Sequence, residues 1–186
     1  MQHDDHVRLI ARGIEPGQGG AWAEFGAGSG AFTLALRDLA GPSTEIIAID
    51  ADAGSLNELR RAMGRRFPGT RLETRVADFT EPHDLPLLDG ILAANSLHYV
   101  RNQVGLLQQW RAFLRPGGRL IVVEYDADVG NRWVPYPFSF VTFGALAEAA
   151  GFTDPTLLGA YPSRFLGGIF AAVTEPVQEP GDAAGR

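Results

Sequence analysis

The sequence contains no cysteine and no lysine, and these two absences narrow its chemistry. Without cysteine there is no disulfide, no thiolate metal site, no iron–sulfur cluster and no cysteine nucleophile. All 16 basic residues other than histidine are arginine. A Schiff-base lysine and the usual lysine of a phosphate-binding loop are therefore excluded as well.

No apolar run is long enough to cross a bilayer, and the N-terminus lacks a signal-peptide pattern. We therefore expect a cytoplasmic protein without a membrane segment. The 186 residues, 45% of them hydrophobic, suit one domain with one substantial core. The net charge of −6 argues against a nucleic-acid partner, because such proteins usually carry a basic face that neutralises phosphates.

Strand-like runs alternate with helical patterns along most of the chain. Helices are expected at 32–39, 53–67 and 104–114, and strands at 21–25, 45–49, 71–76, 87–94 and 120–124. The strands are apolar enough to be buried on both sides. This β-α-β alternation predicts an α/β fold, a doubly wound, Rossmann-like parallel sheet covered by helices on both faces.

The two ends of the chain depart from this alternation. Runs at 156–161 and 165–173 flank Pro162-Ser163-Arg164 and predict an antiparallel hairpin at the sheet edge. His3-Asp4-Asp5-His6 carries metal-ligand side chains, but near a terminus we expect it to be mobile and unliganded. We expect a short N-terminal segment, one domain and a flexible polar tail, with bounds 1–20, 21–174 and 175–186.

The strongest functional signal is Glu24-Phe25-Gly26-Ala27-Gly28-Ser29-Gly30, between the first predicted strand and the first predicted helix. Glycines let the backbone turn sharply and let a ligand approach where a Cβ would block it. The following helix points free N–H groups at the same place. Alone, such a loop fits either a dinucleotide site or a tight turn.

Two carboxylates sharpen this signal. Asp50 ends the second predicted strand and can accept hydrogen bonds from a ribose diol. Asp78 ends the third, where it can accept from an adenine amino group while Phe79 covers the ring. Either aspartate alone is more simply a helix cap or a solvated turn. Three strand ends that converge on one crevice instead predict a site for an adenosine-containing cofactor.

At this point the sequence resembles the class I S-adenosylmethionine-dependent methyltransferases, over residues 21–173. The glycine segment from Glu24 to Gly30 resembles the first motif of the family, Asp50 with Ala51 its ribose-binding position, and Ala77-Asp78-Phe79 its adenine segment. Asn95-Ser96-Leu97-His98-Tyr99 is similar to the fourth motif, at the mouth of the methyl-transfer site. The turn at 114–118 resembles the one before strand five.

The resemblance implies seven strands in the order 3-2-1-4-5-7-6, with strand 7 antiparallel. It implies S-adenosylmethionine as cofactor, a small-molecule acceptor and no metal. The residues expected to bind the cofactor are Glu24, Gly26, Ala27, Gly28, Gly30, Asp50, Ala51, Asp78, Phe79 and Asn95. The short N-terminal segment leaves the acceptor site open, or closed by a second copy in a homodimer or by a partner subunit.

His98 is the candidate catalytic base, because it follows the fourth predicted strand and its pKa range suits proton removal. The competing interpretation is a histidine that packs or hydrogen-bonds structurally. An aromatic segment after the fifth strand fits either an acceptor pocket or ordinary core. Its members are Trp133, Tyr136, Phe138, Phe140 and Phe143. Tyr161 and Arg164 in the hairpin fit either a contact with the acceptor or a solvated turn, and we expect the turn.

Two other functions remain open on the sequence. Gly26-x-Gly28-x-x-Ala31 with Asp50 also fits the fingerprint of an NAD-dependent oxidoreductase. A non-catalytic subunit that binds S-adenosylmethionine and serves a partner is the other alternative.

Overall fold

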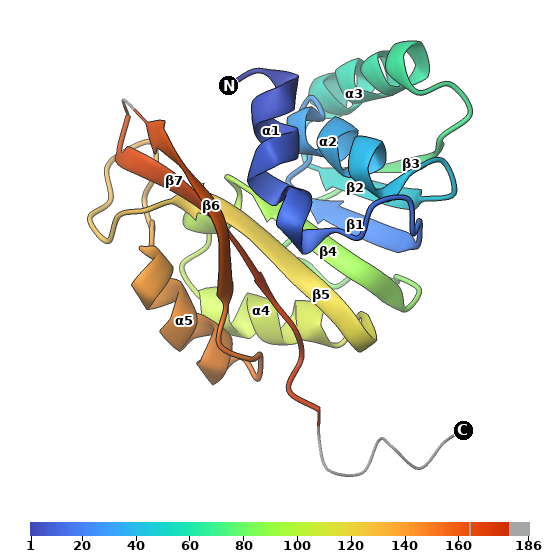
Figure 1. The fold of residues 1–186 in the computed structure, drawn as a ribbon. Coiled ribbons are helices and arrows are strands. Elements are labelled where there is room, and N and C mark those ends of the chain that lie inside the picture. The colour runs from blue at the N-terminus through green and yellow to red at the C-terminus, as the bar shows by residue number, and fades with distance from the viewer. Residues whose placement is uncertain (164, 179–186) are drawn as a thin grey trace.

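The computed structural model describes residues 1–163 and 165–178, and in it the strands form one sheet (Figure 1). The order is β3-β2-β1-β4-β5-β7-β6. Pairing is parallel from β3 to β5, and β7 runs antiparallel to both β5 and β6. This confirms the predicted topology. The bounds are β1 Ala21–Phe25, β2 Glu45–Asp50, β3 Arg71–Val76, β4 Leu88–Ala94, β5 Leu114–Tyr125, β6 Thr156–Ser163 and β7 Gly167–Thr174.

Helices cover both faces of the sheet (Figure 1). α1, α2 and α3 pack on one face, and α4 and α5 on the other. The bounds are α1 His3–Ile10, η1 Ala11–Gly13, α2 Ala31–Ala40, α3 Ala53–Arg66, η2 Leu97–Tyr99, α4 Gln103–Arg111 and α5 Phe140–Ala149.

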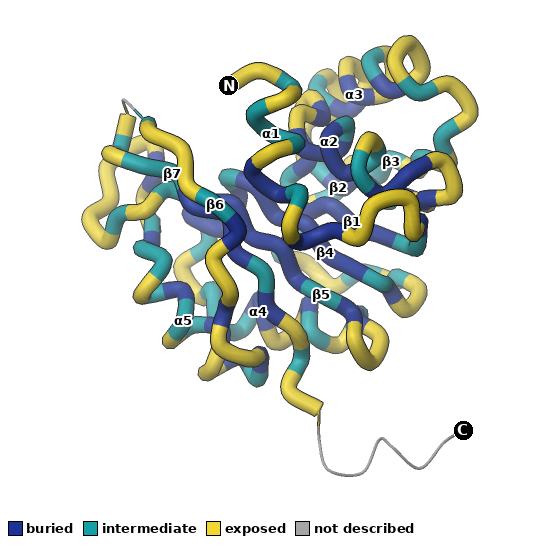
Figure 2. Tube along the Cα trace, viewed as in Figure 1, coloured by how far each residue is buried: buried dark blue, intermediate teal, exposed yellow. Residues whose placement is uncertain are grey.

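The core has two layers, because successive side chains of a strand point to opposite faces. In β1, Trp22 joins the layer under α1, α2 and α3, whereas Ala23 and Phe25 join the layer under α4 and α5. The Phe25 ring stacks on Trp110 of α4 with centroids 4.4 Å apart. The central strands are buried along their length (Figure 2), as expected for a parallel sheet covered on both sides.

The two ends of the chain follow the sequence only in part. The spacing of Val7, Ile10 and Ile14 favours a small amphipathic helix, and residues 3–10 form a helix, so only the expectation of a mobile His3-Asp4-Asp5-His6 is wrong. His3 Nε2 lies 2.9 Å from Asp38 Oδ2, and the His6 ring packs edge-on against Phe32 at 4.7 Å. At the other end, Pro176 forms an isolated antiparallel bridge with Phe152, which follows α5. The rest of the expected tail, 179–186, and Arg164 lie outside the described residues.

Strand β5 starts earlier than predicted. Leu114 already pairs with Leu88, and the register shifts between Leu88 and Gly90. The expected turn at Pro116-Gly117-Gly118 is therefore an irregularity inside a long strand. Gly117 has a φ of 76°, which allows the chain to bend there without leaving the sheet.

Within residues 1–163 and 165–178, no helix has the length and apolar character needed to span a membrane. The same residues contain no group of three or more histidine, aspartate or glutamate side chains placed to hold a metal ion.

Gly90→Ala should destabilise the fold. Gly90 pairs with Trp22, and a Cβ at position 90 would lie 2.3 Å from Cζ3 of the Trp22 ring. A buried indole cannot move aside cheaply, so we expect a loss of about 1–3 kcal/mol in the free energy of unfolding, measured with urea. Gly64→Ala, on the exposed side of α3 with nothing within 4 Å, is the control. It should stabilise by about 0.5–1 kcal/mol. Equal effects of the two substitutions would contradict the close contact.

Candidate active site

A pocket of about 620 Å³ opens at the carboxyl ends of the parallel strands. Ligands of open α/β sheets bind at this edge, where the strand order reverses, here between β1 and β4. Six of the residues predicted to bind the cofactor line the pocket: Gly26, Asp50, Ala51, Asp78, Phe79 and Asn95. Thr80, Ser96, Tyr99, Val100 and Arg101 complete the lining.

The glycine loop after β1 brings its backbone close to the pocket. Gly26 has a φ of 76°, and a Cβ there would lie 2.5 Å from Cβ of Ser96. Gly28 has a φ of 52°, and a Cβ there would meet nothing within 4 Å. Gly28 therefore faces open space that a ligand can enter. Gly30 and Ala27 do not line the pocket: a Cβ on Gly30 would meet Leu59, and Ala27 is buried in the core.

Asp50 holds the loops on both sides of it. Its Oδ2 accepts a hydrogen bond of 2.8 Å from the Gly28 N–H, and its Oδ1 accepts one of 2.8 Å from the Asp52 N–H. Each oxygen keeps further acceptor capacity toward the pocket. The carboxylate thus fixes the glycine loop and is itself fixed, a structural role that the sequence pattern did not reveal.

Asp78 is exposed just after β3, and hydrogen bonds from Thr80 hold its carboxylate in place. Its Oδ1 accepts hydrogen bonds from both the backbone N–H and the hydroxyl of Thr80, at 2.9 and 2.7 Å. These bonds hold the pKa of Asp78 below its ordinary value, the backbone bond most strongly. Phe79, beside it, is half-buried on the pocket wall. Asp78 and Phe79 thus lie together on the pocket wall, and their role in binding adenine stays a prediction.

Two buried oxygen atoms at the site have no hydrogen-bond partner among the described residues. They are Oε2 of Glu24 and Oδ1 of Asn95. Glu24 is 1% exposed, and its burial raises its pKa to about 8, with the Thr33 hydroxyl opposing and the Asp50 charge adding to this effect. Asn95 has a φ of 52°, which is strained for a residue with a side chain. Unpartnered polar atoms and a strained residue at one sheet edge are typical of a ligand site.

His98 does not line the pocket but lies behind it, paired with a residue that the prediction missed. His98 and Glu124 are 2% and 1% exposed, and Nδ1 lies 2.7 Å from Oε2 of Glu124. Oε1 of Glu124 also accepts the His98 backbone N–H at 3.3 Å. In the tautomer that donates from Nδ1 to Glu124, Nε2 is the ring nitrogen left to accept a proton. One feature of the sequence could have pointed to Glu124: it is the only charged residue in the otherwise apolar run 120–124.

The aromatic segment after β5 divides between core and surface. Phe138 and Phe143 are buried and pack around Phe170, with centroids 6.1 and 6.0 Å away. For these residues the core interpretation holds. Trp133 and Tyr136 are exposed, and the Tyr136 N–H donates to the His98 carbonyl at 2.9 Å. The segment therefore supports the backbone that carries His98.

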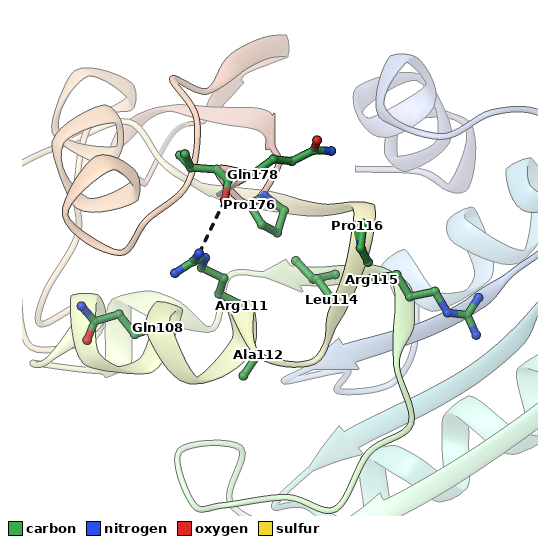
Figure 3. Close-up of a pocket in the computed structure, with 9 residues that line it drawn as sticks. Gln108, Arg111, Ala112, Leu114, Arg115, Pro116, Pro176 and Gln178 are labelled. Atoms are coloured by element: carbon green, nitrogen blue, oxygen red, sulfur yellow. Dashed lines mark hydrogen bonds between the residues drawn. The ribbon is translucent and has the colours of Figure 1, made fainter. Parts of the chain in front are cut away.

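A second pocket of about 360 Å³ lies at the opposite edge of the sheet (Figure 3). It is formed by the end of α4, the start of β5 and the C-terminal segment. Arg111 reaches the Val177 carbonyl across it at 3.5 Å. None of the residues predicted to bind the cofactor lies there, so the candidate site is the pocket at the carboxyl edge.

A family model described as "Methyltransferase domain" matches residues 23–120, which carry the glycine loop, both aspartates, Asn95 and His98. Among curated proteins, an O-methyltransferase cnsE of Penicillium expansum is 27% identical over 161 residues, covering 84% of this chain and 53% of its own length. A 37.1 kDa protein in a transposon of Streptomyces fradiae, without a known function, is 30% identical over 135 residues, or 70% of this chain and 36% of its own length. The chain thus spans about half or less of these relatives.

Among solved structures, a 1,6-didemethyltoxoflavin-N1-methyltransferase of Burkholderia thailandensis superposes with a TM-score of 0.72. The identity is 20%, over 95% of this chain and 78% of that one. That structure contains S-adenosylhomocysteine and the acceptor 1,6-didemethyltoxoflavin. At this identity the similarity establishes the fold.

Glu24→Gln should remove a pH dependence from the stability. The pKa of Glu24 is raised by burial from 4.5 to about 8 in the folded protein, so the folded state keeps a proton that the unfolded state loses between these values. The parent therefore loses stability as the pH rises through this window. Between about pH 5 and about pH 8, we expect the free energy of unfolding of Glu24→Gln to rise relative to that of the parent by on the order of 1–3 kcal/mol, measured by urea unfolding.

Glu58→Gln, on the exposed face of α3, is the matched control and should show no such trend. A constant difference between Glu24→Gln and the parent across the pH range would mean that the Glu24 carboxyl is ionised in the folded protein.

Proposed function

The chain belongs to the methyltransferase domain family, and on this premise we propose that it transfers the methyl group of S-adenosylmethionine to a small-molecule acceptor. One observation carries the proposal: four neighbouring parallel strands end at one pocket with the groups that an adenosine-containing cofactor needs. The family match also favours a methyltransferase over the NAD-dependent alternative.

The residues of the pocket fit this cofactor. Asp50 would hold the ribose hydroxyls, and Asp78 with Phe79 would hold the adenine. The open space at Gly28 would admit the amino-acid part. The unpartnered Oδ1 of Asn95 and Oε2 of Glu24 suit a ligand that brings N–H donors. The cofactor, when bound, supplies a methyl group on a positively charged sulfur, which is a good leaving group.

The protein would contribute positioning, removal of water and a proton acceptor. Fixing the two reactants in line supplies much of the acceleration of such a displacement. We assign the base to Nε2 of His98, which would take the proton of a hydroxyl or amine acceptor. Glu124 is then a positioning residue, because it fixes the ring orientation and the tautomer of His98. The names of the relatives, an O-methyltransferase and an N1-methyltransferase, support an acceptor of this kind.

The cofactor assignment predicts binding of S-adenosylhomocysteine. Calorimetry should give a Kd on the order of 1–100 µM, with no heat from NAD. Asp50→Asn removes the charge but keeps one oxygen to accept the Gly28 N–H, so its weaker binding would report on the ligand contact. Asp154→Asn, exposed and remote from the pocket residues, is the control. Heat from NAD alone would overturn the proposal, and so would silence from both ligands.

The base assignment predicts that His98→Ala lowers kcat by about 10²–10⁴-fold with an acceptor found by screening, and leaves S-adenosylhomocysteine binding intact. Glu124→Ala should lower kcat by about 10–100-fold. It should also move the His98 proton from Nδ1 toward Nε2, seen in imidazole ¹⁵N chemical shifts. Unchanged turnover in His98→Ala would contradict the proposed role of His98 as the base. Cofactor binding without turnover of any acceptor would favour the binding-only subunit.

A further inference from the structure

The second half of α3 carries four arginines, Arg60, Arg61, Arg65 and Arg66, and all four are exposed. With Glu58 as its one acidic residue, the helix bears a charge of +3, although the whole chain has a net charge of −6. The remainder of the chain is therefore at −9. Positive charge is concentrated on one helix of an otherwise acidic protein.

The packing of α3 turns part of this charge outward. Leu56, Leu59 and Met63 are buried in the core and fix the inner side of the helix. Arg61 and Arg65 lie one helical turn apart and point away from that side. The helix lies at the outside of the molecule, with exposed residues along it (Figure 2).

The two outward arginines are not neutralised within the protein. Arg66 lies 3.9 Å from Asp38, but neither Arg61 nor Arg65 forms an ion pair in the part of the chain that the structure describes. Like charges one turn apart repel each other and weaken a helix. The negative end of the helix dipole accounts for arginines in the last turn, but not for Arg60 and Arg61 a turn earlier.

A hollow of about 360 Å³ lies between α3 and the glycine loop. It is lined by Ser29, Glu58, Arg61, Ala62 and Arg65, which together carry a charge of +1. The hollow shares no residue with the candidate pocket at the carboxyl edge. It is therefore a second surface, which reaches the glycine loop at Ser29.

We propose that α3 is a docking surface for an acidic segment of another protein, whose carboxylates pair with Arg61 and Arg65 and whose side chains enter the hollow beside Ser29. Carboxylates one turn apart on a partner helix would match the spacing of the two arginines, and each guanidinium can bind a carboxylate through two hydrogen bonds. Because these charges are exposed, the contact is strongest at low ionic strength. The proposed contact does not depend on methyl transfer.

An acidic protein fits this surface better than a nucleic acid. The arginines from 60 to 66 cover only about 9 Å of helix, at about 1.5 Å per residue. A nucleic acid extends its charge well beyond that distance and would meet the acidic remainder of the surface. Phe67, at the end of α3, is half-buried with the guanidinium groups of Arg37 and Arg66 over its ring, at 5.1 and 5.5 Å. This ring is therefore not free to stack on a base.

The test uses a labelled peptide of four Ala-Glu-Glu-Ala repeats, in which glutamates recur one helical turn apart. The same peptide with glutamine in place of glutamate is the uncharged control, and an oligothymidylate of equal charge represents nucleic acid. At about 25 mM salt, fluorescence anisotropy should give a Kd on the order of 10–100 µM for the acidic peptide. Binding should weaken by about tenfold or more at about 250 mM salt. In an amide NMR titration, the shifts should move at Ser29 and along α3.

Variants locate the contact. Arg61→Glu combined with Arg65→Glu should weaken binding of the acidic peptide by about tenfold or more, and the corresponding pair of glutamine substitutions by about threefold. Arg12→Glu combined with Arg132→Glu changes the net charge equally at exposed positions outside α3, and should leave the Kd within about twofold of the parent. Each double variant should unfold cooperatively in urea, as the parent does, because the substituted side chains are exposed.

Three outcomes would overturn the proposal. The first is absence of binding of the acidic peptide at low salt. The second is an equal loss of binding in the α3 pair and the control pair, which would mean attraction to the overall charge alone. The third is tighter binding of the oligothymidylate through the same two arginines, which would make α3 a nucleic-acid surface.

Discussion

The hydrogen bonding of the parallel sheet continues past the last residue of its strands, and the site depends on this extension. The N–H groups of Gly26 and Ala27 both donate to the Ile49 carbonyl, at 2.9 and 3.1 Å. Beyond β3, the Ala77 N–H donates to the backbone carbonyl of Asp50 at 3.0 Å. Beyond β4, the Asn95 N–H donates to the backbone carbonyl of Val123 at 2.8 Å. Loops tied in this way cannot drift. The glycine backbone and the side chains that follow each strand are therefore held in register with one another before any ligand arrives.

Carboxyl groups at this edge differ in state because their surroundings differ. Asp78 is exposed and bonded to Thr80, which holds its pKa low. Glu24 is buried, which raises its pKa to about 8, and the charge of Asp50 adds to this effect. Asp50 accepts hydrogen bonds from the backbone N–H groups of Gly28 and Asp52. The paired strands β1 and β2 thus carry a carboxyl whose pKa is raised and a carboxylate that accepts backbone hydrogen bonds.

The fold and the cofactor edge of the site could be predicted, because strand ends and turn glycines are local features of the chain. Asp50 and Asp78 stood where parallel strands had to end together. The partner of His98 could not be predicted, since it depends on how η2 and β5 orient two side chains that are 26 residues apart in the sequence. The same limit applied to the aromatic residues. Phe138 and Tyr136 are two positions apart, yet one is core and the other exposed, which only packing decides.

The hairpin of β6 and β7 has a consequence for how such a protein can evolve. Because β7 inserts beside β5, the turn between β6 and β7 brings Phe165 next to Tyr125, the last residue of β5. The glycine loop and the aspartates come from the first half of the chain, and this hairpin comes from the last. Insertions or deletions at the tip of the hairpin would change the surface near Tyr125 without altering the loops that carry the glycines and the aspartates. Changes in the hairpin can therefore accumulate while the loops that carry Asp50 and Asp78 stay unchanged.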